Sequence, residues 1–130
     1  MNEREAMMDF KLELIQVPVS DIDAAKDFYV ERLGFAADVD ARVDENVRFV
    51  QLTPPGSACS IALTSGVHEM RPGSLGGIQV VVADADLAHA ELTGRGVEVS
   101  PVQEFPWGRF VYFADPDGNG WAIQQLPARD

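Results

Sequence analysis

The sequence is poor in the residues that bind metals and form disulfides. It has one cysteine, Cys59, and two histidines, His68 and His89, among 130 residues. A single cysteine excludes an intramolecular disulfide and suits a reducing compartment. Two histidines in separate segments do not supply the two-histidine, one-carboxylate set of a non-haem iron centre. We expect His68 and His89 to have structural or surface roles and Cys59 to lie in the core.

Long apolar runs and positive charge are also scarce. The longest apolar runs, such as Ile78–Val82, have strand length, and the first residues lack the basic-then-apolar order of a signal peptide. Ten basic residues stand against 21 acidic ones, for a formal charge of −11. This charge would repel a phosphate backbone. We therefore expect a cytoplasmic protein without a membrane or nucleic-acid partner, whose acidic residues form a solvated surface or favour cationic ligands.

The remaining composition is that of an ordinary globular domain. Hydrophobic residues make up 46% of the chain and charged residues 24%, which is far from disordered or fibrous composition. A chain of 130 residues can bury a core without cross-links. One domain over residues 1–130 is the expectation.

An internal repeat is the most informative feature of the sequence. Residues 15–23 match residues 78–86 at an offset of 63, with six of nine positions identical, and residues 48–50 match residues 109–111 at an offset of 61. Two matches in the same order along the chain indicate a duplicated unit. We place the units at residues 10–65 and 76–127, with a linker over 65–75.

Each unit is predicted to form a strand, a helix and three further strands. In the first unit Ser20 can cap a helix that runs to about Leu33 at apolar helical spacing. Glycines Gly94 and Gly96 close the second helix. Alternation and turn residues predict the strands at 11–19, 36–41, 47–53 and 59–64, and again at 97–102, 109–114 and 121–126.

Two motifs resemble a known family. Residues 19–35 (VSDIDAAKDFYVERLGF) resemble the opening of the vicinal oxygen chelate superfamily, which includes glyoxalases, bleomycin-resistance proteins and extradiol dioxygenases. Residues 112–121 (YFADPDGNGW) resemble its last hairpin. The likeness covers residues 10–126. It implies an α+β fold of two tandem βαβββ modules that form a curved mixed sheet around a cleft, and it implies a homodimer.

The resemblance also implies a metal site, which this chain does not match. Family members take His, Gln or Glu ligands from the first and fourth strands of each unit. The corresponding positions here carry Leu14, Ala62, Gly77 and Ala122. Slipping each strand by two residues gives the neutral donors Gln16, Ser60 or Thr64, Gln79 and Gln124. Without imidazole or carboxylate ligands we expect no metal and no cofactor.

Five residues are candidates for binding a small molecule instead: Gln16, Ser60, Gln79, Trp107 and Gln124. Gln16 and Gln79 occupy matching repeat positions. They either face each other across the cleft as ligand contacts or satisfy each other as a buried pair. Trp107 can stack on a flat ligand, whereas its neighbours Phe105 and Phe110 are equally compatible with core or dimer contacts.

Two further features have structural interpretations. Arg48 and Arg109 match in the repeat, which fits a repeated ion pair at least as well as anion capture. Residues 115–120 (DPDGNG) imitate the start of a calcium loop, but the twelfth position is Leu126 rather than glutamate, so they predict a turn.

Two functional hypotheses follow. The first is a metal-independent protein of the glyoxalase/bleomycin-resistance type that binds, and sequesters, a bulky or cationic drug-like ligand. The alternative is a metal-dependent lyase, isomerase or dioxygenase of the same fold. The residues identify no catalytic group.

Overall fold

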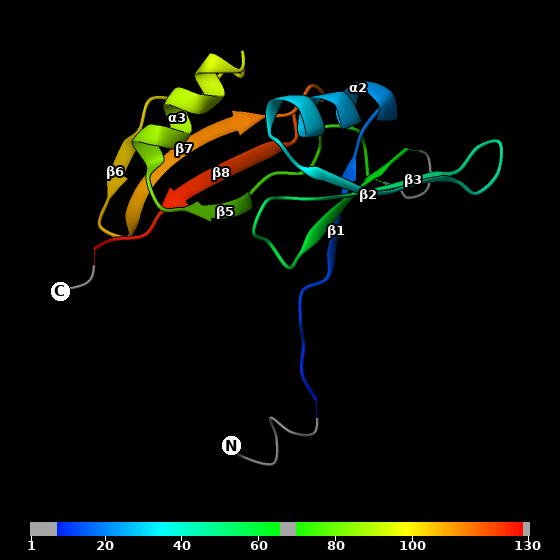
Figure 1. Cartoon of the computed structure of the whole chain (residues 1–130), viewed down its shortest axis with the longest axis horizontal. Coiled ribbons are helices and arrows are strands. Elements are labelled where there is room, and N and C mark those ends of the chain that lie inside the picture. The colour runs from blue at the N-terminus through cyan, green and yellow to red at the C-terminus, as the bar shows by residue number, and fades with distance from the viewer. Residues whose placement is uncertain (1–7, 66–69, 129–130) are drawn as a thin grey trace.

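Two four-stranded sheets of the same topology form the computed structural model, which describes residues 8–65 and 70–128 (Figure 1). The first sheet has the order β1-β4-β3-β2 and the second the order β5-β8-β7-β6. In each, the first and last strands of the unit pair in parallel and the others pair antiparallel. The strands are β1 (Leu14–Pro18), β2 (Ala36–Arg42), β3 (Arg48–Thr53), β4 (Ser60–Thr64), β5 (Ile78–Val82), β6 (Gln103–Phe105), β7 (Gly108–Ala114) and β8 (Gly120–Gln125). This confirms the predicted α+β fold with tandem mixed sheets.

One helical segment follows the first strand of each sheet. Helix α2 (Ile22–Asp27) continues as the π-helix η1 (Phe28–Arg32), and α3 (Ala85–Gly94) follows β5. Both helices begin at an aspartate, because the side chain of Asp21 accepts the Ala24 N–H at 3.0 Å and that of Asp84 accepts the Leu87 N–H at 3.1 Å.

The prediction that Ser20 caps the first helix was wrong. Its hydroxyl donates instead to Asp117 Oδ1 at 2.6 Å, and its backbone N–H donates to Asp117 Oδ2 at 3.1 Å. Ser20 therefore connects the end of the first strand to the β7–β8 turn, while Asp21 takes the capping position.

The predicted strand at residues 97–102 was also wrong, since β6 spans Gln103–Phe105. The hydroxyl of Ser100 accepts the Tyr112 N–H at 2.9 Å, so a side chain occupies the position that a ladder bond would need. The alternating valines in this segment wrongly predicted a strand, because Val97 packs into the core where the chain leaves α3. Cys59, expected in the core, is half-buried just before β4.

One of the two histidines lies within the described residues. His89 is half-buried on α3, and His68 lies outside the described residues.

One hydrophobic core spans both sheets and both helical segments. Successive strand side chains point to opposite faces of a sheet. One set enters the core: Val17, Val50, Leu52, Ile61, Leu63, Ile78, Val111, Phe113, Trp121 and Ile123. The other set lies on the opposite side of each sheet, which we call its open face.

A buried carboxylate ties the two halves of the chain together. Asp115 Oδ2 accepts the Tyr29 hydroxyl at 2.7 Å and the Asn119 amide at 2.8 Å. Asp115 Oδ1 accepts the backbone N–H groups of Asp117, Gly118 and Asn119 at 3.0, 3.0 and 2.9 Å. The Tyr29 oxygen in turn accepts the Trp121 indole N–H at 3.0 Å. Burial, followed by the charge and hydrogen bond of Asp115, raises the pKa of Tyr29. Residues 115–120 are therefore a turn, as predicted.

The two helical segments meet reciprocally. Arg32 Nη1 donates to the Arg95 carbonyl at 2.8 Å, and Arg95 Nη1 donates to the Arg32 carbonyl at 3.2 Å, from positions 63 residues apart. Both guanidinium groups lie at the carboxyl ends of their helical segments, where positive charge is favourable. This symmetry agrees with the repeat.

The segment before β1 is extended and projects from the sheets (Figure 1). Its alternate apolar side chains are exposed, Phe10 at 87% and Leu12 at 71%. We call residues 8–13 the N-terminal arm. Within residues 8–65 and 70–128, the helices are too short or too polar to cross a bilayer.

The Tyr29 hydroxyl should be a major source of stability. We expect Tyr29→Phe to lower the free energy of unfolding by about 1–3 kcal/mol, because a buried carboxylate loses a donor and a buried indole N–H loses its acceptor. Urea denaturation measures the change. Tyr112→Phe removes a hydroxyl from an exposed ring and should cost much less; equal losses in the two variants would contradict the assignment.

Candidate ligand-binding site

Four aromatic side chains cover part of the open face of the second sheet, and we call them the aromatic platform: Phe105, Trp107, Phe110 and Tyr112. The Phe105 and Trp107 rings are stacked with centroids 5.1 Å apart, and Phe110 and Tyr112 are nearly parallel at 6.0 Å. Phe105 contacts Phe110 edge-on at 5.8 Å. Trp107 is 60% exposed and Tyr112 38%. The platform thus presents aromatic surface that its own chain does not cover.

A chain of amide hydrogen bonds borders this platform. Gln79 Nε2 donates to Gln124 Oε1 at 2.7 Å, and Gln124 Nε2 donates to the Trp107 carbonyl at 3.0 Å. The structure thus brings together three of the five predicted ligand contacts. Their role in binding stays a prediction.

The strand register sets the width of the site. Ala122 on β8 pairs with Gln79 on one side and with Tyr112 on the other. Gln124 pairs in the same way with Val81 and Phe110. Ala122, between Gln79 and Tyr112 in this row, has a short side chain and is 7% exposed.

Gly108 allows the hydrogen-bonded amides of Gln79 and Gln124 to reach the turn between β6 and β7. Its φ is +141°, and a Cβ there would lie 2.5 Å from the Gln125 carbonyl oxygen and 3.3 Å from Gln124 Nε2. Sequence reasoning missed both Gly108 and Tyr112. The signal for Tyr112 was present, because it alternates with Phe110 along one strand.

The other two predicted contacts lie on the open face of the first sheet. Gln16 is exposed and pairs through Ala62 with Gln51. Ser60 is buried, with its hydroxyl 2.6 Å from that of Thr53, and Thr53 donates to Asp38. Gln16 and Gln79 are both exposed, so they are not a buried pair, and Gln79 bonds to Gln124 instead.

The positions that would carry family metal ligands do not fit a metal. Ala62 and Ala122 occupy the middle of β4 and β8 on the open faces, and Leu14 and Gly77 offer no donor side chain either. Across the described ranges, groups of three or more His, Cys, Asp or Glu suited to a metal ion are absent. The nearby donors are amides, hydroxyls and the single carboxylate of Asp38, which Thr53 already contacts, a set that does not hold a divalent transition metal firmly.

The matching arginines form ion pairs. Arg48 contacts Asp23 at 2.7 Å and Asp40 at 2.8 Å, and Arg109 contacts Asp86 at 2.7 Å. The repeated ion pair is therefore correct. Hydrogen bonds from Arg48 and Lys26 lower the pKa of Asp40, and the hydrogen bond from Arg109 lowers the pKa of Asp86.

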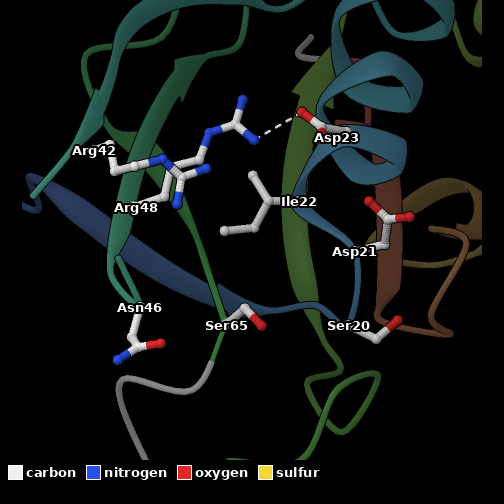
Figure 2. A pocket seen from close by; sticks show the side chains of 8 residues that line it. All are labelled: Ser20, Asp21, Ile22, Asp23, Arg42, Asn46, Arg48 and Ser65. Carbon is white, nitrogen blue, oxygen red and sulfur yellow. Dashed lines mark hydrogen bonds and ion pairs between the residues drawn. The ribbon is translucent and has the colours of Figure 1, made fainter. Parts of the chain in front are cut away.

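A polar hollow of about 340 Å³ lies beside the first of these ion pairs (Figure 2). Figure 2 shows Arg48 directed at Asp23, with Ile22 between the strand and the helix start and Asp21 nearby. Because the lining carries Asp21 and Asp23 as well as Arg42 and Arg48, the hollow offers little net positive charge to an anion. Its lining residues are Ser20, Asp21, Ile22, Asp23, Arg42, Asn46, Arg48 and Ser65.

The fold and the site together define a class of protein. Two mixed sheets of one topology, each with a core face and an open face, are a tandem βαβββ architecture of the α+β class. The chain belongs to the Glyoxalase/Bleomycin resistance protein/Dioxygenase superfamily, whose model matches residues 11–123.

Individual relatives agree with this assignment. The chain is similar to the structure of TnmS3, described as an antibiotic binding protein from Streptomyces sp. CB03234, with a TM-score of 0.85, 39% identity and coverage of 92% of this chain and 98% of that one. A glyoxalase/bleomycin resistance protein from the same strain has a TM-score of 0.79 and 41% identity over 88% and 100% of the chains. An uncharacterized protein of Shewanella frigidimarina is 30% identical over 86% of this chain and 90% of its own.

The Arg48 ion pairs should be visible in the acid titration of Asp40. A lowered carboxyl pKa contributes stability that is complete above the unfolded-state value and is lost as the pH falls through the folded-state value. We expect Arg48→Met to raise the pKa of Asp40 toward the ordinary aspartate range, measured by NMR titration of its carboxyl carbon. Arg42→Met is the control, because Arg42 contacts the Glu45 carbonyl rather than Asp40. An unchanged Asp40 titration in Arg48→Met would show that Lys26 alone sets the value.

Proposed function

We propose that this protein binds a flat, bulky, drug-like molecule on the aromatic platform and sequesters it without a metal and without chemical conversion. The observation that carries the proposal is the 60% exposed Trp107, held by stacking on Phe105 and bordered by the Gln79–Gln124 amides. Small-molecule sites commonly combine apolar and aromatic surface with a few placed polar groups.

The pre-formed stacking of the platform favours binding by aromatic contact. Rings that are already ordered lose little conformational freedom when a ligand stacks on them. The relative described as an antibiotic binding protein, at 39% identity, supports a ligand of this kind. The formal charge of −11 adds attraction for cationic ligands at a distance.

The alternative is an enzyme of the same superfamily, which includes glyoxalases and dioxygenases. A metal-dependent lyase, isomerase or dioxygenase needs a Lewis acid that grips substrate oxygens or activates dioxygen. The apolar residues at the four family ligand positions favour binding over this chemistry. Stoichiometric nickel, zinc, manganese or iron in the purified protein would reverse that preference.

Mitoxantrone, a flat anthraquinone with two amine-bearing arms, is a suitable probe. We expect saturable binding in equilibrium dialysis that survives EDTA treatment, and recovery of the probe with unchanged mass. Trp107→Ala should weaken binding roughly tenfold, because stacking contributes about that much. The control is Leu87→Ala, which removes a comparably exposed apolar side chain from α3. Unsaturable binding, or equal affinity in the Trp107→Ala variant, would refute the proposal.

We also propose that the protein is a homodimer and that the N-terminal arm contributes to the contact. Phe10 and Leu12 lie on the same side of an extended segment, and water covers most of their surface. Burying such side chains against a second copy would be favourable by about 1.5–3 kcal/mol each.

Charge on the arm should therefore dissociate the dimer. We expect the double variant Phe10→Asp/Leu12→Asp to sediment as a monomer at concentrations where the unsubstituted protein sediments as a dimer. Val43→Asp serves as control, because Val43 is an exposed apolar residue in the β2–β3 connection. A monomeric unsubstituted protein, or a double variant that stays dimeric, would exclude this role for the arm.

The unit boundaries at residues 10–65 and 76–127 and the cytoplasmic location also stay proposals. The repeat and the reciprocal Arg32–Arg95 contacts support the former. The single cysteine supports the latter.

A further inference from the structure

We infer that the carbonyl oxygen of Gln79 accepts a hydrogen bond from the ligand, so that the platform selects flat molecules with a hydroxyl or amine donor at the rim of the ring system. This inference rests on the proposed function, since it names the ligand class of the same site. It assigns Gln79 a role in specificity that is separate from the stacking role of Trp107.

The orientation of both amides follows from one backbone group. The Trp107 carbonyl can only accept a hydrogen bond, so the amide of Gln124 must direct its nitrogen to it, at 3.0 Å. The oxygen of Gln124 then faces the other way and must be approached by a donor. The nitrogen of Gln79 is that donor, at 2.7 Å. The Gln79 nitrogen uses one of its two N–H groups on Gln124, so the oxygen is the end of the Gln79 amide whose full hydrogen-bonding capacity is left for a ligand.

The position of Gln79 suits contact with the edge of a stacked ring. Gln79 and Tyr112 flank Ala122 in one row across β5, β8 and β7. Neighbouring strands are about 4.8 Å apart, so the amide lies roughly 10 Å across the sheet from the Tyr112 strand. That distance matches the width of two to three fused rings. A ligand stacked on the platform would thus bring a rim substituent to Gln79.

A second series of hydrogen-bonded side chains, on the open face of the first sheet, has the same donor-to-acceptor direction. Asp38 as a carboxylate can only accept, so Thr53 donates to it and Ser60 donates to Thr53. The free hydrogen-bonding capacity of this series lies in oxygen lone pairs. The Gln79 oxygen, together with the acidic charge of the protein, favours ligands that are rich in donors.

The test compares two probes of the same shape, 2,6-dihydroxynaphthalene and 2,6-dimethoxynaphthalene. Methylation removes the donors and keeps the flat rings. We expect the dihydroxy probe to bind roughly fivefold more tightly, the effect of one net hydrogen bond, in a fluorescence or NMR titration. Gln79→Leu should abolish this preference, whereas Gln51→Leu, the same change on the other sheet, should keep it. Gln79 is exposed, and urea denaturation checks that the variant is folded.

The outcomes separate the two proposals. If both probes bind the unsubstituted protein equally, or the dimethoxy probe binds more tightly, the donor preference is wrong while aromatic stacking stands. A preference that persists in Gln79→Leu also overturns the role of Gln79. If neither probe binds, and mitoxantrone does not bind either, the proposed function fails and the inference fails with it.

Discussion

The buried carboxylate of Asp115 is the constraint on which the arrangement of the two halves depends. A charge removed from water must be matched by donors. Here the donors come from its own turn, from Asn119 and from Tyr29 on the other half of the chain. The Asn119 amide also donates to the Pro18 carbonyl at 2.8 Å. Because these bonds are directional, they fix how η1 and β1 meet β8, and thereby the single core that both sheets share.

Because the two sheets share one core, each sheet has a second, open face that does not contribute to that core. On the second sheet that face is aromatic and bordered by amides, and on the first it combines Phe49 with the polar residues Gln16 and Gln51 and the hydrogen-bonded series Ser60–Thr53–Asp38. The alternation of strand side chains makes this separation possible, since residues next to one another in sequence serve the core and the open face in turn. Ala62 and Ala122 carry no metal-binding side chain, and this is why the function we propose is recognition by stacking and hydrogen bonding rather than Lewis-acid catalysis.

The sequence was sufficient to predict the architecture, but not the long-range hydrogen bonds that connect its elements. The repeat predicted the duplicated topology, and the two motifs predicted the family, because periodicity and turn chemistry are local properties. The strand at residues 97–102 failed because a tertiary bond from Tyr112 to the Ser100 hydroxyl interrupts the ladder. Ser20 was misassigned for a similar reason, since its partner Asp117 is 97 residues away. Gln79, Trp107 and Gln124 were each predicted, yet the direction of their hydrogen bonds depends on a backbone carbonyl that no side-chain pattern reveals.

The reciprocal contact between Arg32 and Arg95 has an evolutionary consequence. Each guanidinium group binds a backbone carbonyl of the other half rather than a side chain, and every residue type provides such a carbonyl. After a gene duplication, neither copy would have had to preserve a complementary side chain at this junction. Mutations could then accumulate independently in the two halves. The second half could acquire aromatic side chains at positions where the first half kept amide and hydroxyl side chains.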